Sequence, residues 1–268
     1  MPGASFRFRP RQAIVMPMSA EVFDDLTDVY EATIDWPKRL GNEQGLFRWL
    51  FDRVRAKRIL DVACGTGRHA AMIHSWGLEV EGADISPNMI RRCRQTHGEP
   101  AGLRWAVRPF DQAAEQPGSF DVAMCIGNSL ALAADYETVA VAIGHMISAV
   151  RAGGAIVIHV PNLFSLPDGQ PVWQKCVRAS LPRGDCLIIK GIHRCGAQGF
   201  VHVLVTRLDA LSQPALRTEC VPFLGLESGE LERLACQSGA TAVEFFGDYR
   251  RQVYDRPKSP DLIMICIK

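Results

Sequence analysis

The chain has 268 residues, of which 47% are hydrophobic, and its formal net charge is +1. This length is sufficient for one large domain, or for one domain with an elaborated insert. The near-neutral charge gives no bulk attraction to a nucleic acid or a membrane surface, so neither is expected as a partner.

The N-terminal segment is expected to be neither a signal peptide nor a transmembrane helix. Residues 1–20 are predicted to form an irregular arm whose arginines are solvated. The apolar stretch 13–18 is short and contains Pro17, so it predicts neither a signal peptide nor a transmembrane helix. Nine cysteines are scattered without a C-x-x-C pair, which favours free thiols in a reducing cytoplasm. No Cys/His cluster has zinc-ligand spacing, so no metal is expected.

Strand-like and helix-like segments alternate over the first part of the chain. Residues 21–55 are predicted to be helical, because apolar side chains within 42–55 recur at helical spacing. Ser86 followed by Pro87 predicts a helix start, with serine as N-cap and proline in the first turn. Such alternation predicts an α/β fold with a mostly parallel open sheet and helices on both faces. The expected strands are 58–62, 78–83, 103–107, 120–125 and 155–160, and the helices between them include 68–76 and 135–150.

The pattern changes after Pro161. Residues 162–225 contain Pro/Gly-rich loops and strand-like runs without helices between them, which predicts an antiparallel insert over the carboxyl edge of the sheet. Residues 21–268 are therefore expected to form one domain, in which 162–225 is a cap over the substrate. The strand-like runs of this insert are 187–192, 200–207 and 215–223; helix 226–238 and strands 241–246 and 262–268 then complete a seven-stranded Rossmann-like sheet.

A Gly-rich turn joins the first strand to its helix. Gly65 and Gly67 let a ligand approach the backbone, and the helix start directs free N–H groups at it. Asp84 ends the second strand, where an acid can accept both hydroxyls of a ribose. The turn lacks the third glycine of the dinucleotide pattern G-x-G-x-x-G. These features favour an adenosine compound over a pyrophosphate-linked dinucleotide, although a nucleotide-dependent oxidoreductase stays an alternative.

At this point the chain resembles the class I S-adenosylmethionine-dependent methyltransferases, over roughly 25–268. The run from Asp61 to Gly67 has their acid-x-small-x-Gly-x-Gly form. Further segments resemble the glycine and sarcosine N-methyltransferases and their small-molecule relatives. These segments are Tyr30, Ile34–Trp36 and Arg39, Ser119–Val122 with Cys125–Leu130, and Gly247–Tyr249. Arg151–Gly154 resembles the helix-to-strand turn of the whole superfamily.

The resemblance implies S-adenosylmethionine as cofactor, a small-molecule substrate and N-methylation ahead of O-methylation. It places Asp84 at the ribose and Arg39 at the cofactor carboxylate, where guanidinium geometry is suited to a charge-assisted pair. The alternatives are a small-molecule O-methyltransferase and a non-catalytic module that binds adenosine ligands. A homo-oligomer is compatible with the sequence. The remaining cofactor residues implied are Ala63, Gly65 and Gly67 on the methionine side, Ile85, Met89 and Phe110 at the adenine, and Ile126, Asn128 and Ser129 near the sulfonium.

Two residues are candidates for catalysis. Tyr30 belongs to the segment that caps the cofactor in the resembling subgroup. His159 ends the fifth strand, at the sheet edge where α/β proteins bind ligands, and is the best candidate base for a hydroxyl acceptor. An amine acceptor needs no dedicated base, because desolvation alone favours its neutral form.

Two prolines depart from the family pattern. Pro109 occupies the place after the third strand where relatives have an acid or amide that contacts adenine. Pro161 stands where glycine N-methyltransferases have the arginine that holds the substrate carboxylate. We therefore expect glycine to be a poor substrate and the acceptor to be larger and less anionic, unless Arg183 or Arg250 replaces that arginine.

Overall fold

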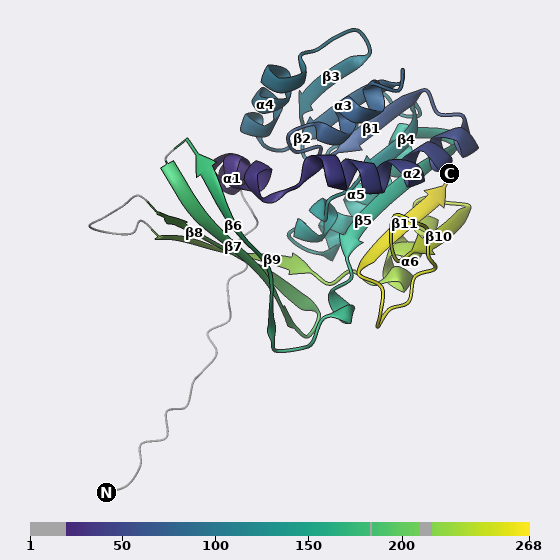
Figure 1. Ribbon diagram of the computed structural model, residues 1–268. Coiled ribbons are helices and arrows are strands. Elements are labelled where there is room, and N and C mark those ends of the chain that lie inside the picture. The colour runs from purple at the N-terminus through teal and green to yellow at the C-terminus, as the bar shows by residue number, and fades with distance from the viewer. Residues whose placement is uncertain (1–19, 183, 209–215) are drawn as a thin grey trace, which may run out of the picture.

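The computed structural model describes residues 20–182, 184–208 and 216–268 (Figure 1). The predicted irregular arm therefore lies outside the described residues up to position 19, and so does Arg183. Among the described residues, no helix is long and apolar enough to cross a membrane.

The central sheet has seven strands in the order β10-β11-β5-β4-β1-β2-β3. All neighbouring strands run parallel except β11, which is antiparallel to both β10 and β5. This arrangement confirms the predicted α/β fold with a mostly parallel sheet. The strand bounds are β1 Arg58–Val62, β2 Glu79–Asp84, β3 Leu103–Val107, β4 Phe120–Cys125, β5 Val150–Pro161, β10 Ala242–Phe246 and β11 Asp261–Ile267.

Helices cover both faces of this sheet, and each face has its own buried cluster. One cluster joins the sheet to α2 and α3 through residues such as Phe47 and Ile73, and the other joins it to α5 and α6 through Ile143 and Leu231. The helices are α1 Ala20–Thr33, α2 Trp36–Val54, α3 Arg68–His74, α4 Pro87–His97, α5 Tyr136–Ala149 and α6 Ser228–Gln237, with short 3₁₀ helices η1 Ser129–Leu132 and η2 Leu163–Ser165.

Local capping explains two helix starts. Ser86 Oγ accepts a hydrogen bond from the Met89 N–H at 3.1 Å and caps α4, which confirms the predicted start. The region 21–55 divides into two helices, because Asp35 caps α2 by accepting from the Lys38 N–H at 3.1 Å.

A second sheet of four antiparallel strands, β6-β7-β8-β9, follows β5. It confirms the predicted antiparallel insert and lies beside the central domain next to α1 (Figure 1). Its first strand was not among the predicted runs, because Pro171 and alternating polar residues weaken the strand signal there. The strand bounds are β6 Pro171–Leu181, β7 Gly184–Cys195, β8 Gln198–Arg207 and β9 Leu216–Leu224.

Candidate functional site

The turn between β1 and α3 has a left-handed backbone. Ala63, Gly65 and Gly67 all have positive φ, at 58°, 57° and 77°. A Cβ atom added at Gly67 would lie 2.6 Å from the Trp105 ring and 2.9 Å from Cys93 Sγ, so that only glycine fits here. The close packing of Trp105 therefore requires glycine at position 67, whereas the Cβ position of Gly65 has only the Tyr30 ring within 4 Å, at 3.9 Å.

Asp84 ends β2 and organises the loops on both sides of it. Its Oδ2 accepts a hydrogen bond from the Gly65 N–H at 2.8 Å, and its Oδ1 accepts one from the Ser86 N–H at 2.9 Å. The carboxylate is 8% exposed and is held rigidly beside the turn. Such a fixed acid provides acceptors for a pair of ligand hydroxyls.

Asp61 is the most unusual acid of the site. It is 1% exposed, and neither of its carboxylate oxygens has a hydrogen-bond partner of good geometry among the described residues, although the nearby Ala70 backbone N–H acts to lower its pKa. Burial, and then the nearby charge of Asp84, raise the pKa of Asp61 to about 8. A buried carboxyl group without a partner is costly, and a ligand ammonium group would remove that cost.

Other buried polar atoms without partners belong to elements that meet at the same edge. They come from the start of α2, from α3, from the segment after β4, from the end of β5 and from the loop before β11. In the part of the chain that the structure describes, these atoms are Trp36 Nε1, Arg68 Nε, Asn128 Oδ1, His159 Nε2 and Tyr249 Oη. These atoms could form hydrogen bonds with a polar ligand or with water at this edge.

A buried carboxylate links α2 to α3. Glu43 is 5% exposed and accepts hydrogen bonds from Arg39 Nε at 2.9 Å and from His69 Nε2 at 2.5 Å. Burial opposes ionisation of Glu43, but the His69 hydrogen bond and the charge of Arg39 outweigh it and hold the Glu43 pKa below its ordinary value. Burial lowers the pKa of His69. A Cβ at Gly127 would lie 3.1 Å from Arg39 Nη2, so the guanidinium group reaches the segment after β4.

His159 connects the ends of β4 and β5. Its Nδ1 accepts a hydrogen bond from the Gly127 N–H at 3.3 Å, and its carbonyl accepts one from the Asn128 N–H at 3.2 Å. Its Nε2 lies 3.1 Å from Asp261 Oδ1, within ion-pair distance but without hydrogen-bond alignment. A backbone N–H can only donate, so Nδ1 is unprotonated and the neutral ring carries its proton on Nε2. Asn128 itself has a positive φ of 76°.

Comparison with known proteins identifies the family. Residues 59–154 match the family model described as a methyltransferase domain. Human glycine N-methyltransferase is 32% identical over 47% of this chain and 51% of its own length. Glycine/sarcosine N-methyltransferase of Parasynechococcus marenigrum is 29% identical over 86% of this chain and 79% of its own length.

Solved structures show the same fold. The CcbJ methyltransferase from Streptomyces caelestis superposes with a TM-score of 0.75 at 18% identity, over 91% of this chain and 97% of its own. A sugar N-methyltransferase from a Streptoalloteichus species gives a TM-score of 0.71 at 17% identity, over 100% of this chain and 98% of its own.

The chain belongs to the class I S-adenosylmethionine-dependent methyltransferases. Within this family it is related to the glycine/sarcosine N-methyltransferases at about 30% identity. Its match spans about half the length of the human relative, so the activity and substrate of the whole protein are treated below as proposals.

In this methyltransferase fold, the expected capping residues lie over the glycine turn. A Cβ at Gly65 would lie 3.9 Å from the Tyr30 ring, which packs edge-on against Trp36 with ring centroids 5.8 Å apart. Burial raises the pKa of the Tyr30 phenol, so its hydroxyl stays protonated at neutral pH. Tyr249 packs edge-on against His159 at 5.1 Å, and burial raises its pKa well above the ordinary value.

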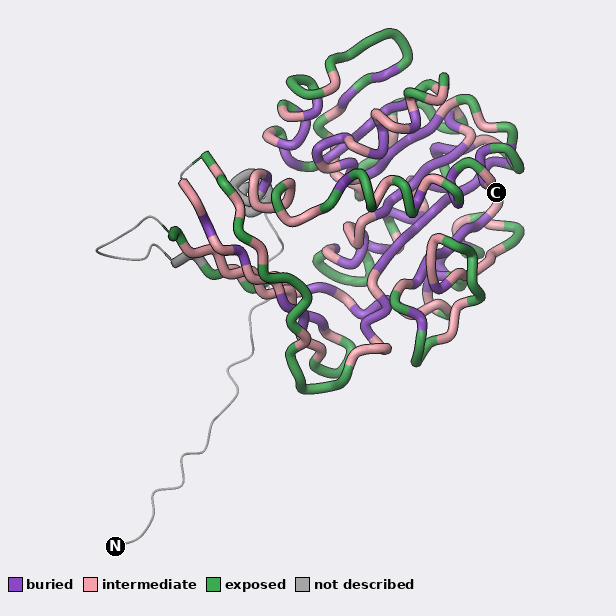
Figure 2. The backbone as a smooth tube through the Cα atoms, viewed as in Figure 1, coloured by how far each residue is buried: buried purple, intermediate pink, exposed green. Residues whose placement is uncertain are grey.

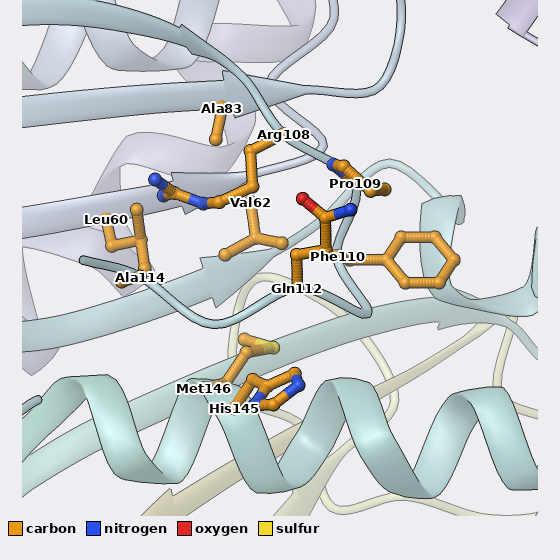
Figure 3. A pocket seen from close by; sticks show the side chains of 10 residues that line it. All are labelled: Leu60, Val62, Ala83, Arg108, Pro109, Phe110, Gln112, Ala114, His145 and Met146. Atoms are coloured by element: carbon orange, nitrogen blue, oxygen red, sulfur yellow. The ribbon is translucent and has the colours of Figure 1, made fainter.

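The residues expected at the adenine follow β2 and β3. Met89 is buried against Thr27, with its Sδ 3.6 Å from the threonine hydroxyl, whereas Ile85 is 38% exposed. Phe110 lines a small pocket, and its ring points away from Met146 and the pocket's other lining side chains (Figure 3). The lining residues are Leu60, Val62, Ala83, Arg108, Pro109, Phe110, Gln112, Ala114, His145 and Met146.

The structure thus places the cofactor candidates other than Arg39 at the ends of β1, β2, β3 and β4 or just after them, while Arg39 of α2 reaches the segment after β4. Ile126 is buried, and Ser129 Oγ donates to the Ile126 carbonyl at 3.2 Å. Sequence reasoning did not single out the partnerless state of Asp61 or the role of Glu43. An acid within a helix rich in apolar residues was the only sequence signal for Glu43. No group of three or more metal-ligating side chains occurs among the residues that the structure describes.

Proposed function

We propose that the protein transfers a methyl group from S-adenosylmethionine to a nitrogen of a small-molecule metabolite. The observation that carries the proposal is the pair of buried acids, Asp61 and Asp84, beside a bare left-handed turn. One acid already binds two backbone N–H groups, and the other lacks a partner among the described residues. Together they fit a ligand that has a ribose at one end and an ammonium group at the other.

The residues present fit this cofactor. Asp84 would hold the ribose hydroxyls, Asp61 the ammonium group and Arg39 the carboxylate, while the turn would contact the methionine chain. Bound S-adenosylmethionine supplies an activated methyl group on a sulfonium sulfur. The protein then has to align the acceptor with that methyl group and exclude water, and orientation alone can provide about 7–11 kcal/mol of a barrier.

The tautomer of His159 supports nitrogen as the acceptor atom. Its Nδ1 lone pair is engaged by the Gly127 N–H, and its Nε2 proton faces Asp261. The neutral ring therefore lacks a free lone pair to take a proton from a hydroxyl group. An amine acceptor needs only desolvation to become neutral, and the aromatic rings of Tyr30 and Tyr249 contribute an apolar surface for it.

Two calorimetric titrations and one transfer assay test the proposal. We expect S-adenosylmethionine to bind with 1:1 stoichiometry and NAD not to bind. A radiolabelled-methyl assay against a panel of amines and alcohols should find turnover among the amines. Binding without turnover of any acceptor would favour the non-catalytic module, and turnover of hydroxyl acceptors alone would favour O-methylation.

The insert 162–225 is proposed to cap the substrate, because it leaves the domain from the ligand edge of β5. Protection of this segment from hydrogen exchange should rise when cofactor and acceptor are both bound, and identical exchange would contradict a cap. Pro161 leaves β5 without the carboxylate-binding arginine, so slow turnover of glycine is expected. The nine free cysteines favour a reducing compartment such as the cytoplasm as the place of action.

A further inference from the structure

We propose that Lys190, on the inner face of the insert sheet, binds an anionic group of the methyl acceptor. This inference rests on the proposed function, because it assigns a substrate class to the same site. It would place the anion on the insert sheet, and not on the loop after β5 where glycine N-methyltransferases have their arginine.

The alternation of buried side chains along β7 shows on which face of the insert sheet Lys190 lies. Cys186, Ile188 and Ile192 are buried, and Ile192 belongs to the cluster that includes the central sheet. Lys190 has the same parity and therefore shares this inner face. The ring of Trp173, which is 59% exposed, covers Gly191 on the opposite face.

Two cations oppose each other across the ladder. Lys175 of β6 is the direct pairing partner of Lys190, and like charges at such positions destabilise a sheet. The ammonium group of Lys175 has a structural role, because Nζ donates to the Thr33 carbonyl at 2.5 Å. Thr33 is the last residue of α1, where a cation is favoured by the helix dipole.

Lys190 has no corresponding structural partner. Within 20–182, 184–208 and 216–268 its ammonium group makes no hydrogen bond or ion pair. Glu219 lies in the same cross-strand row, since Lys190 pairs with Val203 and Val203 pairs with Glu219. Two strand spacings, about 10 Å, separate their backbones, and Glu219 has another interaction of its own.

The surrounding charges are mainly positive. Burial, and then the charges of Lys175 and Arg39, lower the pKa of Lys190. Arg39 already shares Glu43 with His69, so this carboxylate does not neutralise the lysines. An anion bound here would offset the repulsion and favour the protonated form of the ammonium group.

The chemistry fits a carboxylate or a phosphate on the acceptor. A carboxylate would belong to an amino acid, and a phosphate to a phosphorylated or nucleotide-linked amine. This proposal differs from the expectation of a less anionic acceptor, because the missing arginine after β5 is replaced here by a cation from another element.

Lysine-selective NMR tests the proposal. The chain contains only six lysines, so ¹³Cε-labelled lysine gives a small set of signals, and Lys190→Met assigns one of them by its loss. With S-adenosylhomocysteine bound, we expect saturable shifts of the Lys190 signal on addition of acetate or of inorganic phosphate. The probe that binds with the higher affinity shows whether the anionic group of the acceptor is a carboxylate or a phosphate. Sodium chloride at matched ionic strength should not reproduce the shift.

Lys258 is the matched control, because its side chain is 81% exposed and it lies outside the insert. A Lys190 signal that moves no more than the Lys258 signal would overturn the inference. In the methyl-transfer assay, Lys190→Met should raise the acceptor KM about tenfold or more with little change in kcat, as for a lost charge-assisted contact. Lys190→Arg should retain most of the binding, and Lys258→Met should have no effect.

A cofactor-binding measurement distinguishes a failure of the proposed function from a failure of the inference about Lys190. Lys190→Met should bind S-adenosylmethionine with the affinity of the unmodified protein. If the unmodified protein does not bind S-adenosylmethionine, the proposed function fails. If it binds the cofactor but Lys190 does not respond to either anion, only the inference about Lys190 fails.

Discussion

The central sheet and the insert sheet differ in how completely their strands are buried. In β4, all residues but Asp121 are buried, and the strand lies between two helical layers. In β6, no residue is buried, and intermediate and exposed positions alternate along much of the strand. Figure 2 shows this contrast along the backbone.

We relate this difference in burial to two separate roles, cofactor binding and acceptor selection. Buried strands fix the turn at 63–67 and Asp84, because any shift in them would disturb a packed core. The insert sheet has fewer packing constraints, so its inner side chains can differ without loss of the fold. We therefore propose that the central sheet binds the cofactor and that the insert selects the acceptor, and the following predictions test this division.

The largest effect is expected from Gly67→Ala. The new Cβ would collide with Trp105 and Cys93, and the residue would keep a φ of 77°. We expect a loss of about 2–4 kcal/mol in the free energy of unfolding, from overpacking and left-handed strain together. Gly77→Ala is the control, since Gly77 has a φ of 86° but open space around its Cβ position. Equal losses in urea denaturation of the two variants would show that the close contact with Trp105 has no energetic role.

Asp84→Ala should weaken S-adenosylmethionine binding by about 1–3 kcal/mol, the contribution of hydrogen bonds to a charged acceptor. Calorimetry measures the loss, and circular dichroism checks the fold, because Asp84 also holds the Gly65 and Ser86 N–H groups. Asp52→Ala removes the same charge from an exposed position on α2 and should leave the affinity unchanged. An unchanged affinity in folded Asp84→Ala would remove Asp84 from the cofactor site.

Asp61→Asn should change stability and binding in opposite directions. The folded pKa of Asp61, about 8, lies above the unfolded value, so its contribution to stability is present at low pH and is lost as the pH rises toward 8. The loss amounts to at most about 1.4 kcal/mol per pH unit. The asparagine variant should therefore gain melting temperature over the unmodified protein at pH 8 and not at pH 4.

The same substitution should weaken S-adenosylmethionine binding, because an amide does not attract the ligand ammonium group. If the melting-temperature difference is independent of pH, Asp61 is not the group that titrates. If affinity is retained, Asp61 does not contact the cofactor.

The smallest effect is expected from Lys175→Met on the insert sheet. Loss of the contact with the Thr33 carbonyl should lower the free energy of unfolding by about 0.5–1 kcal/mol. Faster hydrogen exchange should be confined to the end of α1 and to β6, and cofactor affinity should not change. Lys258→Met serves as the control. A loss of cofactor affinity in Lys175→Met would contradict the division between the two sheets.

Much of the fold was predictable because its signals are local. The bounds of β1, β3 and β4 agree with the predicted ones, since each is a short apolar run between polar or glycine-containing segments. The N-cap of α4 was predictable for the same reason. β6 was not, because its stability depends on the long ladder with β7 and not on its own residues.

The sequence by itself determined the α/β class, the glycine turn and the acid that ends β2. Each of these depends on neighbouring residues along the chain, through strand burial, backbone freedom and helix capping. The tertiary structure alone decided that Asp61 is buried without a partner, that Glu43 joins Arg39 to His69, and that Lys190 faces Lys175. These properties arise from residues far apart in sequence, because burial and strand register are set only when the chain has folded.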